Sequence, residues 1–285
     1  MDRQQLIDML NKDMAEEHAA ILRYLIHSYL EGEDTAMGAK LLSRAREEMW
    51  HMHWLGMIVG QLGGEPNMEP AEYPHDATNR ATILESYVKY EKMLVPHYAK
   101  EAEMVDDPHI RRVLQREGWE SRMHADKFQK MRDKLSPEEA AGLPGAENEL
   151  SEALAGKIQE SVTSKYRQML QTIRDAWVFQ EKGVAAWQRM DFSMTKMKQL
   201  AHSAEEVAEN GVKPDFSTGG VLEAVKTFEE AISKAVNDLK KTADLHRQLK
   251  EDPEARQHGG LISNLDLTIR QEDDEIGTLG DWQRK

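Results

Sequence analysis

The sequence contains no cysteine, and this absence excludes several kinds of site at once. Disulfide scaffolds, zinc sites built on thiolates, iron–sulfur clusters and cysteine nucleophiles all require thiol groups. Proline and glycine are also scarce, at 9 and 18 of 285 residues, and aromatic residues make up 6% of the chain. Long helices are therefore rarely interrupted, and no extended stretch shows the alternation rich in Val, Ile and Thr that is typical of strands. The sequence predicts an all-α protein.

Basic residues are fewer than acidic ones: the chain has 37 Lys and Arg and 51 Asp and Glu, which gives a formal net charge of −14. A nucleic-acid-binding protein needs a basic surface to neutralise phosphates, so we expect no nucleic-acid partner. Long apolar runs are missing too: none approaches the roughly 18 residues of a transmembrane helix, and residues 2–5 lack the apolar core of a signal peptide. We therefore expect a cytoplasmic protein without a membrane partner.

Glycine and proline divide the first half of the chain into four predicted helices. These are expected at residues 2–31, 34–62, 80–104 and 108–134, with a loop at 68–79. A helix of about 25 residues is about 37 Å long, which is the length of helices in four-helix bundles. The long connection between the second and third helices is typical of a bundle with one crossover.

The second half has a similar plan after a stretch rich in proline, glycine and acidic residues at 136–145, which marks a domain boundary. Helices are expected at about 150–183, 192–210, 220–249 and 261–278. The helix stop Gly64-Glu65-Pro66 has a counterpart at Gly211-Val212-Lys213-Pro214, and Ile83-Leu84-Glu85 has one at Val221-Leu222-Glu223. We interpret this as a tandem duplication. It gives one bundle at 1–135, a linker at 136–149 and a second bundle at 150–285.

Charged residues occupy positions on the apolar stripe of each helix in the first half. These inward positions are Glu17, Glu48, His51, Glu91, Glu117, Glu120 and His124. An unpaired buried carboxylate costs several kcal/mol, so several that converge on one core require a compensating charge, which two divalent cations supply. Glu48 and His51 form a Glu-x-x-His motif whose two side chains share one helical face, as in di-iron and di-manganese carboxylate proteins.

The first helix also carries a more specific pattern. Residues 10–17, followed by Ala20, Ile21, Tyr24 and His27, resemble the first helix of bacterioferritin, and residues 5–132 resemble the ferritin-like di-iron superfamily. This resemblance implies two tandem ferritin-like four-helix bundles, of which the second is degenerate. It also implies two iron ions, with Glu48 as the bridging ligand. We expect no haem, because a haem-ligating methionine would need a symmetric dimer, which the sequence does not show, and we assign the methionines to packing. The metal ligands implied by this resemblance, together with the helix-four residues selected below, are Glu17, Glu48, His51, Glu91, Glu120 and His124.

The fourth helix departs from the family pattern. The family places a glutamate three residues before the helix-four histidine, and position 121 is a serine here. Glu120 and Glu117 lie four and seven residues before His124, and both can share its helical face. We favour Glu120 as the ligand that accompanies His124, with Glu117 as the alternative.

The second half lacks this set of ligands. Alignment on the Gly–Pro stops places Lys196 and Gln199 at the positions of the Glu-x-x-His motif, and a lysine repels a cation. We therefore expect no metal in the second bundle and expect Glu272 and Glu275 to lie on a solvent-exposed face. In the first half, His18, His53 and His97 lie off the apolar stripes and are expected at the surface.

Three functions remain open from the sequence. Oxygen-rich ligands suit iron and manganese, so the first is a di-iron oxidoreductase, a ferroxidase or a peroxidase, that oxidises Fe(II) or reduces O₂ or peroxide. The second is a di-manganese enzyme that resembles catalase. The third is a non-catalytic metal-binding or structural module. A rubrerythrin is disfavoured because its rubredoxin module needs cysteines. We expect a monomer in which the bundles form a pseudo-dimer, or a homodimer.

Overall fold

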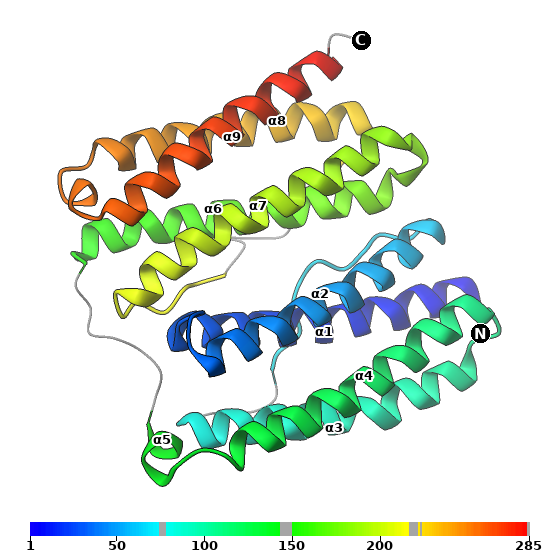
Figure 1. Cartoon of the computed structure of the whole chain (residues 1–285). Helices are drawn as coiled ribbons and strands as arrows, with labels where there is room; N and C mark the ends of the chain where they lie inside the picture. Colours follow the sequence, from blue (N-terminus) through cyan, green and yellow to red (C-terminus); the bar gives the residue numbers. More distant parts are fainter. Residues whose placement is uncertain (74–77, 143–149, 217–221, 223, 284–285) are drawn as a thin grey trace. The chain divides into compact units, whose positions relative to one another are not determined.

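The computed structural model describes residues 1–73, 78–142, 150–216, 222 and 224–283, and all regular structure in these ranges is helical (Figure 1). The all-α prediction is therefore confirmed. The α-helices are α1 (Arg3–Glu31), α2 (Ala36–Gln61), α3 (Arg80–Met104), α4 (Pro108–Arg132), α5 (Pro137–Ala141), α6 (Glu152–Val178), α7 (Val184–Glu209), α8 (Phe228–Glu251) and α9 (Gly259–Gln283). Two short 3₁₀ helices, η1 (Gln180–Lys182) and η2 (Ala255–Gln257), lie between them. The chain forms two compact units, Met1–Pro144 and Gly145–Lys285.

The first unit is a bundle in which α1 packs along α2 and α3 packs along α4 (Figure 1). The helices begin where the sequence supplies side chains that cap them. Asp2 accepts a hydrogen bond from the backbone N–H of Gln5, and Asn79 accepts one from the N–H of Thr82. Pro108 occupies the first turn of α4, where its missing N–H is no loss. Fully buried apolar side chains from all four helices form the core around the bundle axis.

Part of the predicted linker is structured. Residues 137–141 form α5, which contacts α3, and the backbone N–H of Arg80 donates to the carbonyl of Gly142. The other residues of that linker, 143–149, lie outside the described part of the chain. None of the described helices combines the length and the apolar character that crossing a membrane requires.

The second unit repeats the pairing, with α6 packed along α7 and α8 along α9. Its α7 ends as α2 does. Gly63 and Gly211 both have positive φ, at 68° and 77°, and the next residue in each case donates back to a valine carbonyl, Val59 or Val207. The two Gly–Pro stops recognised in the sequence therefore close two helices in the same way.

Two helix starts in the second unit differ from the expectation. α7 begins at Val184, earlier than the expected 192, and α8 begins at Phe228, later than the expected 220. Thr227 caps α8 by accepting from the N–H of Glu230, which fixes the start there. Leu222 thus precedes α8, whereas Leu84 lies inside α3. That stretch of sequence similarity consequently does not mark equivalent positions.

Candidate metal centre

Two groups of buried side chains share Glu48 near the middle of α2. Glu17, Glu48 and His51 form one group, and Glu48, Glu91 and His124 form the other. Within each group, one candidate ligand atom per residue lies within 4.8 Å of the others. All five residues are at most 2% exposed. Helices α1 to α4 each contribute to this cluster, which therefore exists only once the bundle has assembled.

The carboxylate of Glu48 lies between the two histidines. Its Oε2 atom is 2.8 Å from Nδ1 of His51, and its Oε1 atom is 2.7 Å from Nδ1 of His124. The two imidazole rings are stacked, with centroids 6.2 Å apart and planes inclined by 17°. Each oxygen of one carboxylate thus faces a different histidine, which is the geometry required of a ligand that bridges two ions.

Glu17 and Glu91 occupy matching places on either side of this arrangement. Glu17 Oε2 and Glu91 Oε1 each lie 3.4 Å from the Nδ1 atom of the histidine in their own group. Each glutamate also accepts a hydrogen bond from a buried tyrosine: Tyr98 donates to Glu17, and Tyr24 donates to Glu91 over 2.6 Å. These bonds fix the orientation of both carboxylates.

Each histidine also contacts a second carboxylate on its outer side. Nε2 of His51 lies 2.7 Å from Oε2 of Glu120, and Nε2 of His124 lies 2.5 Å from Oε2 of Glu47. A carboxylate in this place fixes the tautomer and the ring orientation of a metal-binding histidine. Glu47 was missed in the sequence because it lies off the apolar stripe. Its only signal was its place beside Glu48.

The two helix-four glutamates have different surroundings. The sequence favours Glu120 as the partner of His124, but the structure places Glu120 against the outer nitrogen of His51 instead. Its side chain is 15% exposed, and it also binds Arg116. Glu117 is completely buried, and neither of its carboxylate oxygens has a hydrogen-bond partner among the residues that the structure describes. Ser121 is buried as well, and the same residues offer its hydroxyl no partner.

Some polar atoms of this cluster have no hydrogen-bond partner among the described residues. Glu48 Oε1 and His124 Nδ1 form an ion pair at 2.7 Å, whereas Glu91 Oε2 has no hydrogen-bond partner among the described residues. Buried polar atoms without partners are costly, and an ion among them would satisfy several at once. The set of oxygen donors with two imidazoles suits iron or manganese. The residues present therefore fit a pair of divalent cations.

Electrostatics support the same conclusion. Burial raises the pKa of Glu17 to about 7 and raises that of Glu117 well above its usual range. Burial opposes the charging of His124, but the nearby carboxylates, Glu48 first, raise its pKa to about 12. Without metal, protons on the carboxyl and imidazole groups of this core therefore compensate its negative charge. Divalent cations would provide that positive charge instead.

A third group of possible ligands combines the buried Asp13 with two partly buried residues, Glu16 and His97. His97 Nε2 is 2.9 Å from Asp13 Oδ1 and 3.3 Å from an oxygen of Glu101. His97 is partly exposed, while His53 is intermediate and His18 is buried at 2% exposure. The prediction that His18 lies at the surface is therefore wrong. Its ring packs inside the bundle, with a hydrogen bond to the backbone of Met68.

This third group gives a pH prediction. Burial raises the pKa of Asp13 to about 8, against 3.8 for an unperturbed aspartate, so the folded state holds a proton that the unfolded state releases between these values. Protonated Asp13 therefore makes its whole contribution to the free energy of unfolding below about pH 4. That contribution decreases as the pH rises from about 4 to 8, by no more than about 1.4 kcal/mol per pH unit. Metal-free Asp13→Asn protein should therefore lose less stability than wild type between pH 5 and 8 in denaturant titrations. Asp8→Asn, an exposed change on the same helix, should leave the wild-type slope; equal slopes for all three proteins would contradict the assignment.

The second unit holds charges of both signs at its centre. Counted from their first residues, the equally long helices α2 and α7 place Lys196 and Gln199 where Glu48 and His51 stand. Lys196 is 1% exposed and pairs with Glu275 of α9.

A second buried pair lies beside the first. Lys165 of α6 binds Glu272, which also lies 3.0 Å from His246. Glu272 and Glu275 are 0% and 3% exposed, so the prediction of a solvent-exposed face is wrong for these two residues. Both were misplaced because their partners lie on α6 and α7, far away in the sequence. Lysines thus supply the positive charge that Glu272 and Glu275 require.

Comparison with known proteins gives a family for the first unit. Residues 7–136 match the ferritin family model, described as a ferritin-like domain. No curated protein matches the chain at a significant level. The matched range includes every member of the two groups around Glu48.

Proposed function

Because residues 7–136 form a ferritin-like domain, we propose that its buried carboxylates and histidines hold two iron ions and that the chain oxidises Fe(II) with O₂ or peroxide. The position of Glu48 carries this proposal, because each of its oxygens faces the inner nitrogen of a different histidine. A second supporting observation is the set of buried oxygens without partners.

The protein residues have separable roles in this proposal. Glu17 and His51, with Glu117 of α4, would hold one ion, Glu91 and His124 would hold the other, and Glu48 would bridge both. Two adjacent ferrous ions together supply the two electrons that reduction of peroxide requires. The tyrosines Tyr24 and Tyr98 keep the outer carboxylates oriented. The complete burial of the cluster keeps bulk water from the ligands.

Iron loading tests the proposal directly. Metal-free protein loaded anaerobically with Fe(II) should bind close to two ions per chain and should then oxidise them faster than buffer does when O₂ or peroxide is added. Absorbance in the near ultraviolet follows the ferric product. Oxidation at the buffer rate by both oxidants, at full loading, would reject the proposal for iron. Bound Mn²⁺ with catalase activity would then indicate manganese chemistry.

The helix-four ligand is tested by two matched substitutions. Glu117→Gln should remove most affinity for the ion on the His51 side, because Glu117 is fully buried near that histidine with both oxygens free. Glu120→Gln should weaken the same ion only about tenfold, since Glu120 acts through the outer nitrogen of His51. Fe(II) titrations of the two variants separate these effects. The opposite order would assign Glu120 as the direct ligand.

A further inference from the structure

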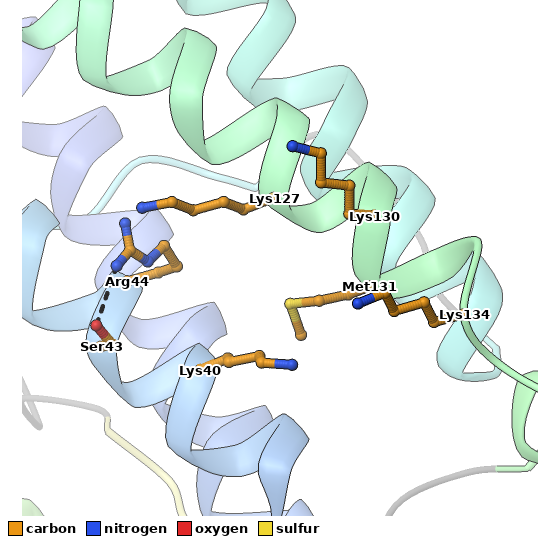
Figure 2. A pocket seen from close by; sticks show the side chains of 7 residues that line it. All are labelled: Lys40, Ser43, Arg44, Lys127, Lys130, Met131 and Lys134. Atoms are coloured by element: carbon orange, nitrogen blue, oxygen red, sulfur yellow. Dashed lines mark hydrogen bonds between the residues drawn. The ribbon is translucent and has the colours of Figure 1, made fainter.

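A pocket of about 310 Å³ between α2 and α4 is lined mainly by basic residues (Figure 2). Its lining residues are Lys40, Ser43, Arg44, Lys127, Lys130, Met131 and Lys134. In Figure 2, Lys127 of α4 extends toward Arg44 of α2, so that the two helices present positive charge to one shared space. Five of the seven lining residues are basic and none is acidic, in a chain whose net charge is −14.

Within the described part of the chain, Glu47 neutralises only part of the positive charge of this pocket. None of its four lysines forms an ion pair within the described ranges of the chain, and only Arg44 does, with Glu47. Lys40 and Arg44 are four residues apart on one helix, a spacing at which like charges repel. The C-terminal end of α4 favours cations such as Lys130. That effect does not account for Lys40, Arg44 or Lys127, which lie away from it.

The guanidinium of Arg44 is already ordered by neighbouring side chains. Arg44 is only 9% exposed, its guanidinium binds Glu47, and a second nitrogen donates to Ser43 Oγ over 3.0 Å. A guanidinium that is already ordered loses little further freedom when it binds an anion. The surrounding lysines supply mobile point charges of the kind that bind phosphate.

We propose that this pocket binds a small anion that carries two or more phosphate groups. Its volume is at the lower end of the range of small-molecule sites. Cations from two helices face one another across it, which suits a ligand with several charged groups. A nucleic acid fits less well, because the basic residues are confined to one pocket, and the net negative charge of the chain repels a long polyanion.

Titration of the full chain with pyrophosphate tests this proposal. The protein is first stripped of metal, so that pyrophosphate cannot act by extracting it. Calorimetry should show one site per chain, with orthophosphate at least tenfold weaker. Met131 is one of the residues that line the pocket, and its side chain ends in a methyl group. Its signal, assigned with Met131→Leu in methionine-labelled protein, should shift on binding. A parallel titration with ATP distinguishes a nucleotide from an inorganic source of the phosphates.

Matched charge reversals distinguish binding at this pocket from nonspecific electrostatic attraction to the protein. Lys127→Glu should weaken pyrophosphate binding at least tenfold, and the double change with Lys40→Glu should abolish it. Lys100→Glu changes the net charge equally at an exposed position of α3 and should have little effect. Circular dichroism checks that each variant is folded. Equal weakening by Lys100→Glu, an unmoved Met131 signal, or tighter binding of duplex DNA than of pyrophosphate would each overturn the proposal.

Discussion

Replacing Glu48 with alanine is expected to remove both metal ions from the protein, not one. The two oxygens of Glu48 face the inner nitrogens of His51 and His124, so the substitution takes one ligand from each of the two groups. Elemental analysis after Fe(II) or Mn²⁺ loading should fall from close to two ions per chain toward none. In contrast, His51→Ala should mainly affect the ion held with Glu17, because His124 retains its own group.

An exposed glutamate on the same bundle provides the control. Glu85 of α3 is 44% exposed, and its ion pairs lie at the surface, so Glu85→Ala should keep the wild-type metal content. A Glu48→Ala protein that still binds two ions would show that Glu48 is not the bridge. Loss of one ion only would assign it to a single group.

The second large effect is expected at the centre of the second unit. Lys196→Met leaves Glu275 without its partner in a site where both side chains are at most 4% exposed. Breaking a buried ion pair from one side typically costs about 3–5 kcal/mol, because an uncompensated charge remains inside the protein. Thermal and denaturant unfolding of the full chain should show this loss for the second unit.

The double variant distinguishes the effect of the unpaired buried charge from the effect of altered packing around Lys196. Lys196→Met combined with Glu275→Leu removes both charges, and such replacements are often neutral or stabilising. We expect it to regain most of the stability lost by Lys196→Met alone. The neighbouring pair of Lys165 with Glu272 stays intact in both proteins. If the double variant were as unstable as the single one, packing around Lys196, and not its charge, would explain the loss.

Local chemistry in the sequence determined the helices and several inward-facing positions. Side-chain caps at Asp2 and Asn79 begin two helices, and glycines in the left-handed region end α2 and α7. Glu48 and His51 share a helical face wherever that helix packs, so their common direction follows from a spacing of three residues. The all-α fold could be predicted for the same reason, because helix signals lie within a few residues of one another.

Helical spacing could not decide which carboxylate meets which histidine. Glu117 and Glu120 both suit the inward face of α4, and only the packing of α2 against α4 places Glu120 on the outer nitrogen of His51. The same packing brings Glu47 to His124, across 77 residues of sequence. A helical period fixes a direction to within one face, whereas a contact between helices also depends on their rotation and axial shift.

The second unit shows the same limit for charges. By composition, Glu272 and Glu275 fit a solvated helix, yet α6 and α7 bring Lys165 and Lys196 to them and make burial tolerable. The sequence determined that Lys196 stands at the position that corresponds to Glu48, since that follows from its place in the helix. Only the tertiary structure decided what the lysine binds, because the energy of a buried charge depends on partners that come from other helices.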